Sequence, residues 1–182
     1  AARLAGIPSS SIAERVRNFK AVEHRLEPVA EIKGVHFFND SKATNVDATI
    51  KALEAFQSGV ILILGGRDKG GDFTVLSSLL QQRAKSLVLL GEASDKIRTQ
   101  LEGAVPMTQA RSMDDAVKLA FQQAAPGNTV LLAPACASFD MFQNYEHRGR
   151  EFKAAVARLQ GTGDRCSSPV LLRLTPDSDG AL

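Results

Sequence analysis

Residues 59–66 read GVILILGG, an apolar run of strand length that ends in two glycines. Two later segments, KSLVLLG at 85–91 and NTVLLAPA at 128–135, have a similar composition. Strands that are apolar on both faces are typical of parallel sheets that are covered by helices on both sides. The run at 59–66 therefore predicts a central strand of an α/β sheet.

Amphipathic segments alternate with these strands, and their apolar residues recur at helical spacing. Shorter strands are expected at 27–34, 35–40 and 104–108. The first two are expected to form a hairpin through a tight turn at Lys33-Gly34. Helices are expected at 9–19, 46–56, 74–83, 93–101, 112–124 and 139–159. The predicted fold class is α/β: a Rossmann-like, open, mostly parallel sheet with helices on both faces and an N-terminal antiparallel hairpin.

The composition is that of an average globular protein and excludes several function classes. Hydrophobic residues make up 44% of the 182 residues and charged residues 23%. Lys and Arg (22) nearly balance Asp and Glu (20) and are scattered, which argues against nucleic-acid binding. No apolar run approaches the roughly 20 residues of a membrane span, and no signal peptide is visible. We therefore expect no nucleic-acid partner and no membrane association.

Cysteines and histidines show no metal-binding pattern. The two cysteines, Cys136 and Cys166, lack the spacing of a metal site or of a disulfide framework. The three histidines, at 24, 36 and 147, are dispersed as well. The expectation is a reduced, cytoplasmic protein with no metal site in this chain.

Three predicted loops carry most of the chemically active side chains. They are NDSKATN at 39–45, LGGRDKGGDF at 64–73 and APACASFDMFQNYEHRG at 133–149. Each follows a strand that is expected to be parallel, and the carboxyl ends of parallel strands meet at the edge of the sheet where ligands bind. The three loops are therefore expected to form one site.

The first two loops each have a structural and a functional interpretation. NDSKATN suits a turn with a helix cap, because Asp, Ser, Thr and Asn favour such positions. The segment 64–73 matches neither a Walker A motif nor G-x-G-x-x-G, and glycines alone also suit a surface turn. Lys69 stands among four glycines, which favours a cation that is presented to an anionic ligand.

The third loop leaves similar alternatives open. Ser138 suits the N-cap of the expected helix, and the same position suits a hydroxyl that binds a carboxylate beside free N–H groups. Cys136 has no base beside it in the sequence, which favours a small buried thiol over a nucleophile. Phe142 and Tyr145, one turn apart on the expected helix, are typical of core residues. The residues EHRG at 146–149 are interpreted as a solvated polar face.

The functional interpretations of the three loops converge on one class of ligand. Lys42 and Thr44 from the first loop, Lys69 from the second and Ser138 from the third offer two cations and two hydroxyls at one edge. Such a set suits a small metabolite that carries carboxylates or phosphates. The residues alone leave the reaction open.

Four segments in this order resemble the C-terminal domain of the Mur ligase family. They are EHRLE at 23–27, NDSKATN, LGGRDKGGDF and LLAPACASFDMFQNYEHRGREF at 131–152. The resemblance runs from about residue 6 to residue 160. Within the family it is most specific to the ligases that add D-glutamate to UDP-N-acetylmuramoyl-L-alanine, because NDSKATN differs from the corresponding residues of the sister ligases and of folylpolyglutamate synthetases.

The resemblance implies an ATP-dependent amide ligase of peptidoglycan synthesis, with consequences for cell-wall biogenesis, cell shape and cell division. In this family ATP phosphorylates the terminal carboxylate of UDP-N-acetylmuramoyl-L-alanine, and the amine of D-glutamate attacks the acyl phosphate. The P-loop and the Mg²⁺ sites belong to a central domain. The expected partners are thus D-glutamate, ATP and the UDP-linked substrate, together with the N-terminal and central domains of the same enzyme.

The resemblance also assigns roles to individual residues. It implies D-glutamate contacts from Thr44, Lys69, Ser138, the backbone at Phe139 and the ring of Tyr145. It implies a catalytic role for Lys42 near the transferring phosphate and a position near the ATP ribose for Asp40. His24 and Arg25 are expected at the hinge and at the edge of the nucleotide.

The same resemblance divides the chain into three parts. Residues 1–22 are expected to end the central ATP-binding domain, residues 23–160 to form the C-terminal domain, and residues 161–182 to be a disordered tail. The chain alone is expected to be inactive. The alternatives are a standalone module that binds an anionic metabolite, or a piece of another Mur-type or folylpolyglutamate-type ligase.

Overall fold

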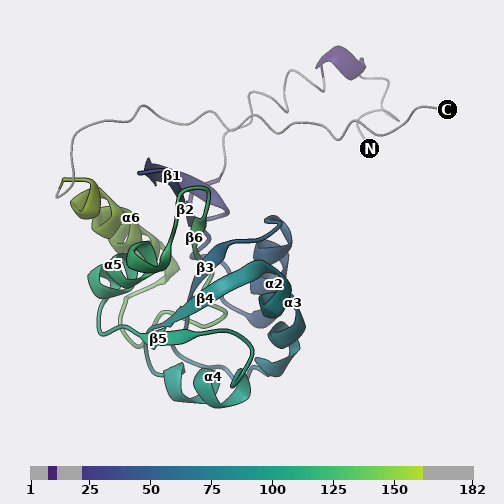
Figure 1. Cartoon of the computed structure of the whole chain (residues 1–182), viewed down its shortest axis with the longest axis vertical. Helices are drawn as coiled ribbons and strands as arrows, with labels where there is room; N and C mark the ends of the chain where they lie inside the picture. Colours follow the sequence, from purple (N-terminus) through teal and green to yellow (C-terminus); the bar gives the residue numbers. More distant parts are fainter. Residues whose placement is uncertain (1–7, 12–21, 162–182) are drawn as a thin grey trace.

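A computed structural model describes residues 8–11 and 22–161 of the chain (Figure 1). Residues 9–11 are helical, and the rest of the helix expected at 9–19 lies outside the described residues. The expected end of a central domain at 1–22 and the expected tail at 161–182 also lie almost entirely outside them. The described chain from residue 22 onward forms one α/β unit.

Six strands form one sheet in the order β1-β2-β6-β3-β4-β5. Their bounds are β1 (Glu27–Ile32), β2 (Val35–Asn39), β3 (Val60–Leu64), β4 (Ala84–Leu89), β5 (Met107–Gln109) and β6 (Thr129–Leu132). Strands β1 and β2 pair antiparallel, and every other pair is parallel. The turn between β1 and β2 places both Lys33 and Gly34 at positive φ. The predicted fold class, including its hairpin, is confirmed.

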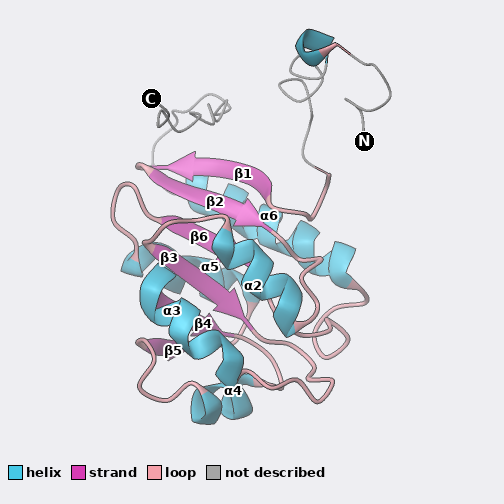
Figure 2. Cartoon of the chain, turned by 90° about the vertical axis from the view of Figure 1, so that its right-hand side faces the viewer, coloured by secondary structure: helices cyan, strands magenta, loops and turns pink. Residues whose placement is uncertain are grey.

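Helices cover both faces of the sheet (Figures 1 and 2). The helices are α2 (Val46–Glu54), the 3-10 helix η1 (Thr74–Leu76), α3 (Ser77–Arg83), α4 (Ser94–Gln100), α5 (Met113–Gln123) and α6 (Tyr145–Gly161). Alternate residues of β3 serve two apolar cores: Leu62 packs with α2, α3 and α4, and Ile63 packs with α5 and α6. This alternation explains why β3 is apolar throughout, since neither of its faces meets water.

The path of the chain creates the place where a ligand can bind. From β3 the chain proceeds outward to β4 and β5, and then returns through α5 to β6, which lies between β2 and β3. Ligands of open α/β sheets bind at the carboxyl ends of the strands, where the strand order reverses in this way. The N–H of Asp40 donates to the carbonyl of Leu132 (2.8 Å) and that of Gly65 to Pro134 (2.9 Å), so the three loops leave the same edge.

The last helix begins later than the sequence predicts. The start predicted for the helix at 139–159 was wrong, because α6 begins at Tyr145. The Asn144 side chain accepts a hydrogen bond from the N–H of His147 (2.7 Å), as an N-cap residue does. Ser138 is therefore not the cap of this helix. Phe142, which was expected one turn before Tyr145 on a helix, lies in the preceding loop.

Candidate ligand-binding site

Backbone hydrogen bonds join the loop at 64–73, the glycine loop, to the loop at 133–149 that carries Ser138. Arg67 and Ala137 exchange two of them, with N···O distances of 2.9 and 3.0 Å. The residues form an isolated antiparallel bridge, which places Ser138 next to the glycine loop. The prediction that these two loops lie together is confirmed by this bridge.

The first loop is joined to the third in the same way. The N–H of Ala135 donates to the carbonyl of Ala43 (3.0 Å), and the Ser41 hydroxyl donates to the carbonyl of Tyr145 (2.8 Å). These contacts connect segments that are about a hundred residues apart in the sequence. All three loops thus form one continuous rim at the carboxyl edge of the sheet.

Arg148 holds the first and third loops from beneath. Its guanidinium donates to the hydroxyl (3.0 Å) and the carbonyl (2.9 Å) of Ser41, and to the carbonyls of Cys136 (3.1 Å) and Ala137 (3.3 Å). Arg148 is only 2% exposed, so the interpretation of EHRG as a solvated face was wrong at this residue. Burial lowers the pKa of Arg148 to about 10, which still leaves it a cation at neutral pH.

The glycine loop presents two exposed cations, Arg67, which is paired with Glu92 (3.1 Å), and Lys69. The Asp68 carboxylate accepts hydrogen bonds from the N–H groups of Gly70 (3.0 Å) and Gly71 (2.9 Å), which closes a tight turn around Lys69. Gly70 has a φ of 82°, a region that glycine enters without strain. Lys69 is exposed, and no hydrogen bond or ion pair of its ammonium occurs within residues 8–11 and 22–161.

Lys42 and two aromatic side chains form a second group on the rim. The Lys42 Nζ lies 3.8 Å from the centroid of the Tyr145 ring, a cation–π contact. The His24 ring meets Tyr145 edge-on, with centroids 6.1 Å apart. The Asn39 amide donates to His24 Nδ1 (2.9 Å), and His24 itself is almost fully buried. His24 therefore supports Tyr145 and Lys42 and does not line the adjoining pocket.

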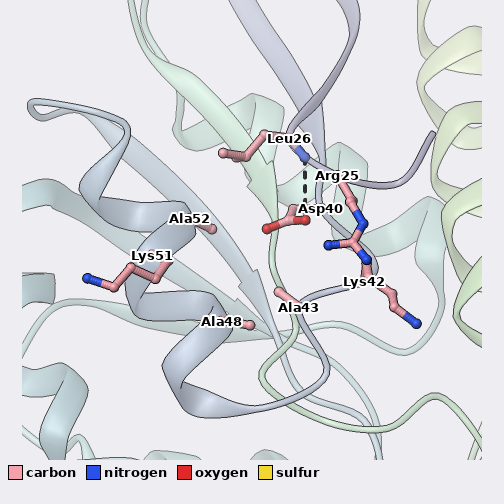
Figure 3. A pocket seen from close by; sticks show the side chains of 8 residues that line it. All are labelled: Arg25, Leu26, Asp40, Lys42, Ala43, Ala48, Lys51 and Ala52. Carbon is pink, nitrogen blue, oxygen red and sulfur yellow. Dashed lines mark hydrogen bonds between the residues drawn. The ribbon is translucent and has the colours of Figure 1, made fainter. Parts of the chain in front are cut away.

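Beside this group lies a pocket of about 270 Å³ between α2 and the start of β1 (Figure 3). Its lining residues are Arg25, Leu26, Asp40, Lys42, Ala43, Ala48, Lys51 and Ala52. Burial raises the pKa of Asp40, opposed by a weak hydrogen bond from the Leu26 N–H (3.4 Å). Arg25 and Lys42 lie to one side of Asp40 and Lys51 to the other.

Lys51 was missed by the sequence analysis. It lies in the last turn of α2 and forms an ion pair with Glu54 (2.7 Å), so in the sequence it looks like an ordinary exposed helix residue. The available signal was its position: Ala48, Lys51 and Ala52 share one face of the helix that follows NDSKATN.

The remaining residues of the expected amino-acid site differ in exposure. Ser138 is buried, and Thr44 is partly buried, with its N–H donating to the Lys42 carbonyl (2.8 Å). The Phe139 side chain is 62% exposed. Cys136 is buried beside them, and burial raises the pKa of its thiol to about 12, which supports the interpretation as an unreactive core residue.

One group of potential metal ligands is already paired with a lysine. Single ligand atoms of Glu23, His24 and Glu27 lie within 4.8 Å of one another. The Lys153 ammonium of α6 lies 2.6 Å from the Glu23 carboxylate and 3.0 Å from that of Glu27. This cluster is therefore an ion-pair network that fastens the beginning of the domain to α6.

The open sheet and its three joined loops define a class: an open α/β domain whose loops meet at the carboxyl edge of the sheet. Within the described part of the chain, no helix combines the length and the apolar character needed to cross a bilayer. Residues 24–136 match the family model described as Mur ligase, glutamate ligase domain. The chain belongs to this family.

Curated relatives are similar over most of the chain. The UDP-N-acetylmuramoylalanine–D-glutamate ligase of Solibacter usitatus is 56% identical over 160 residues, which are 88% of this chain and 36% of that protein. The enzyme of the same name from Koribacter versatilis is 57% identical over 155 residues, which are 85% of this chain and 34% of that protein. The chain thus spans about a third of the length of these relatives.

Solved structures of more distant proteins share the fold. A pseudomurein peptide ligase type C from Methanothermus fervidus superimposes with a TM-score of 0.60 at 15% identity, over 88% of this chain and 34% of that one. The MurF ligase of Thermotoga maritima, solved in complex with ADP, gives 0.55 at 16% identity, over 87% and 36%. At these identities the likeness concerns the fold alone.

Proposed function

We propose that the chain is the C-terminal domain of an ATP-dependent ligase that joins D-glutamate to UDP-N-acetylmuramoyl-L-alanine in cytoplasmic peptidoglycan synthesis. The names of the similar curated proteins support this proposal. Because the chain spans about a third of their length, the P-loop and the UDP-binding region are assigned to the remainder of the enzyme. The domain described here binds the amino acid and closes over the nucleotide.

The observation that carries the proposal is the ammonium of Lys69, which has no hydrogen-bond or ion-pair partner in the part of the chain that the structure describes. It stands on a loop that Asp68 closes, and the Arg67–Ala137 bridge sets that loop beside Ser138. D-Glutamate has two carboxylates. Lys69 suits one of them as a cation, and the Ser138 and Thr44 hydroxyls suit the other as hydrogen-bond donors.

The pocket around Asp40 suits the ribose and the phosphates of ATP. A carboxylate accepts hydrogen bonds from ribose hydroxyls, and Arg25 and Lys42 place positive charge to one side of it. Asp40 is the one carboxylate among the lining residues. A Mg²⁺ ion needs several oxygen ligands. We therefore assign Mg²⁺ mainly to the remainder of the enzyme.

Lys42 is assigned the catalytic role in the proposed reaction. The reaction brings a phosphorylated carboxylate and a dicarboxylic amino acid together, so negative charge accumulates where they meet. A preorganised cation at that place stabilises the transition state more than the separated reactants. Lys42 stands between the Asp40 pocket and Tyr145, which suits it to contact the transferring phosphoryl group.

The test is amino-acid-dependent release of ADP by the complete enzyme with UDP-N-acetylmuramoyl-L-alanine. We expect turnover with D-glutamate and at least tenfold less, as an order of magnitude, with L-glutamate or a diamino acid, because those ligands leave polar groups of the site unpaired. The 182-residue chain alone should give no turnover. Preference for another amino acid, or turnover by the chain alone, would refute the proposal.

A further inference from the structure

Helix α4 holds the second half of the glycine loop. The Lys96 Nζ lies 2.6 Å from the Asp68 carboxylate and 2.8 Å from the carbonyl of Gly71. One helical turn later, the Gln100 side-chain oxygen accepts a hydrogen bond from the N–H of Phe73 (2.9 Å). Since residues four apart share one face of a helix, a single face of α4 contacts the loop from residue 68 to residue 73.

The charge of Lys96 matters because of where Asp68 stands. Asp68 directly precedes Lys69, the cation that is proposed to bind D-glutamate. A carboxylate at this position repels an anionic ligand unless a cation neutralises it. The hydrogen bond from Lys96 is the main cause that lowers the pKa of Asp68, so Asp68 is ionised and paired at neutral pH.

We propose that Lys96 is a positioning residue for amino-acid binding: it neutralises Asp68 and keeps the glycine loop closed, so that Lys69 meets the ligand as an uncompensated cation. This inference rests on the proposed function. Lys96 does not touch the ligand in this account. It acts through Asp68 and through the carbonyl of Gly71.

If the ion pair only stabilised the fold, loss of Lys96 would lower the stability of the protein, and this is not what we expect. Lys96 and Asp68 are 37% and 25% exposed at their side chains, and partly exposed ion pairs contribute little to stability. Loss of Lys96 should therefore leave the fold nearly as stable as before. Its effect should fall on the affinity for the anionic amino acid, since the unpaired Asp68 would then stand beside Lys69.

The experiment is a double-mutant cycle in the complete enzyme, read as steady-state kinetics with D-glutamate varied. Lys96→Met should raise KM for D-glutamate roughly 5- to 20-fold, the range of coupling within one charge network, with kcat changed less than about twofold. Adding Asp68→Asn removes the repelling charge and keeps an oxygen for the N–H groups of Gly70 and Gly71. The double variant should therefore recover most of the lost affinity.

Lys118→Met is the matched control, because Lys118 is exposed on α5 at the opposite face of the sheet and should leave KM unchanged. A wild-type KM in Lys96→Met, or a double variant no better than the single one, would overturn the inference. Lys69→Ala distinguishes failure of the inference about Lys96 from failure of the proposed role of the glycine loop. If it weakens D-glutamate binding while Lys96→Met does not, only the role of Lys96 fails; if both are silent, the proposed role of the loop fails too.

Discussion

The ammonium of Lys42 rests 3.8 Å from the centroid of the Tyr145 ring, which joins the first loop of the site to the first turn of α6. A cation–π contact at a partly exposed position contributes about 0.5–1 kcal/mol, which corresponds to about a two- to fivefold effect. Tyr145→Leu should therefore lower kcat of the complete enzyme by about that factor. Tyr145→Phe keeps the ring and should retain nearly full activity. Equal losses in both variants would assign the effect to the hydroxyl.

Arg148 should be far more important for stability than its exposed neighbour Arg150. Arg148→Met leaves the buried carbonyls of Ser41 and Cys136 without a donor, and we expect the free energy of unfolding to fall by about 2–4 kcal/mol. Arg150→Met should change it by less than about 0.5 kcal/mol. Urea denaturation of the 182-residue chain measures both. Equal stability of the two variants would show that Arg148 is dispensable.

Gly149 is expected to tolerate no side chain, although it lies within α6. A methyl group there would collide with Nδ1 of His24 and lie 3.1 Å from the Asn39 amide nitrogen. Gly149→Ala should therefore lower the free energy of unfolding by about 1–3 kcal/mol, despite the better helix propensity of alanine. Gly161→Ala, whose added methyl meets nothing within 4 Å beyond its own helix backbone among the described residues, should be neutral or slightly stabilising. A stable Gly149→Ala variant would contradict the packing of His24.

The pH dependence of the free energy of unfolding should reflect the protonation of the Asp40 carboxyl. Burial raises its pKa in the folded state above the ordinary value of 3.8, so the folded state binds the proton more tightly than the unfolded one. The resulting contribution to stability is fully present below pH 3.8 and is lost as the pH rises through the raised pKa. Asp40→Asn has no carboxyl to titrate at this position, so its stability should not decrease in this way as the pH rises. Its advantage in unfolding free energy over the wild type should grow from acid to neutral pH, and a difference that is independent of pH would contradict the account.

Much of the fold was predictable because each strand carries its own signal. The alternation of β3 between two apolar cores leaves a fully apolar run, and parallel strands necessarily bring their following loops to one edge. The meeting of NDSKATN and of the glycine loop with the loop at 133–149 therefore followed from the order of elements. The individual roles of Thr44 and Ser138 came from the family resemblance and stay predictions.

Features that depend on distant partners were not predictable. Arg148 reads as a surface residue, and its burial follows from carbonyl groups of Ser41, Cys136 and Ala137 that only the folded chain brings together. The start of α6 was placed six residues too early because Ser138 is itself a favourable cap. Asn144, which caps the actual start, is an equally favourable cap residue, so cap preference alone did not decide between the two positions.

The most direct test of the central claim is Lys69→Ala in the complete enzyme, with D-glutamate and ATP varied in turn. Loss of one partner of a charge pair that ligand binding desolvates costs about 2–5 kcal/mol, so kcat/KM for D-glutamate should fall at least roughly 30-fold. KM for ATP should change much less, because the rest of the enzyme holds most of the nucleotide. Lys118→Ala on α5 serves as the control. Wild-type kinetics with D-glutamate in Lys69→Ala would show that the glycine loop is only a turn and would contradict the account.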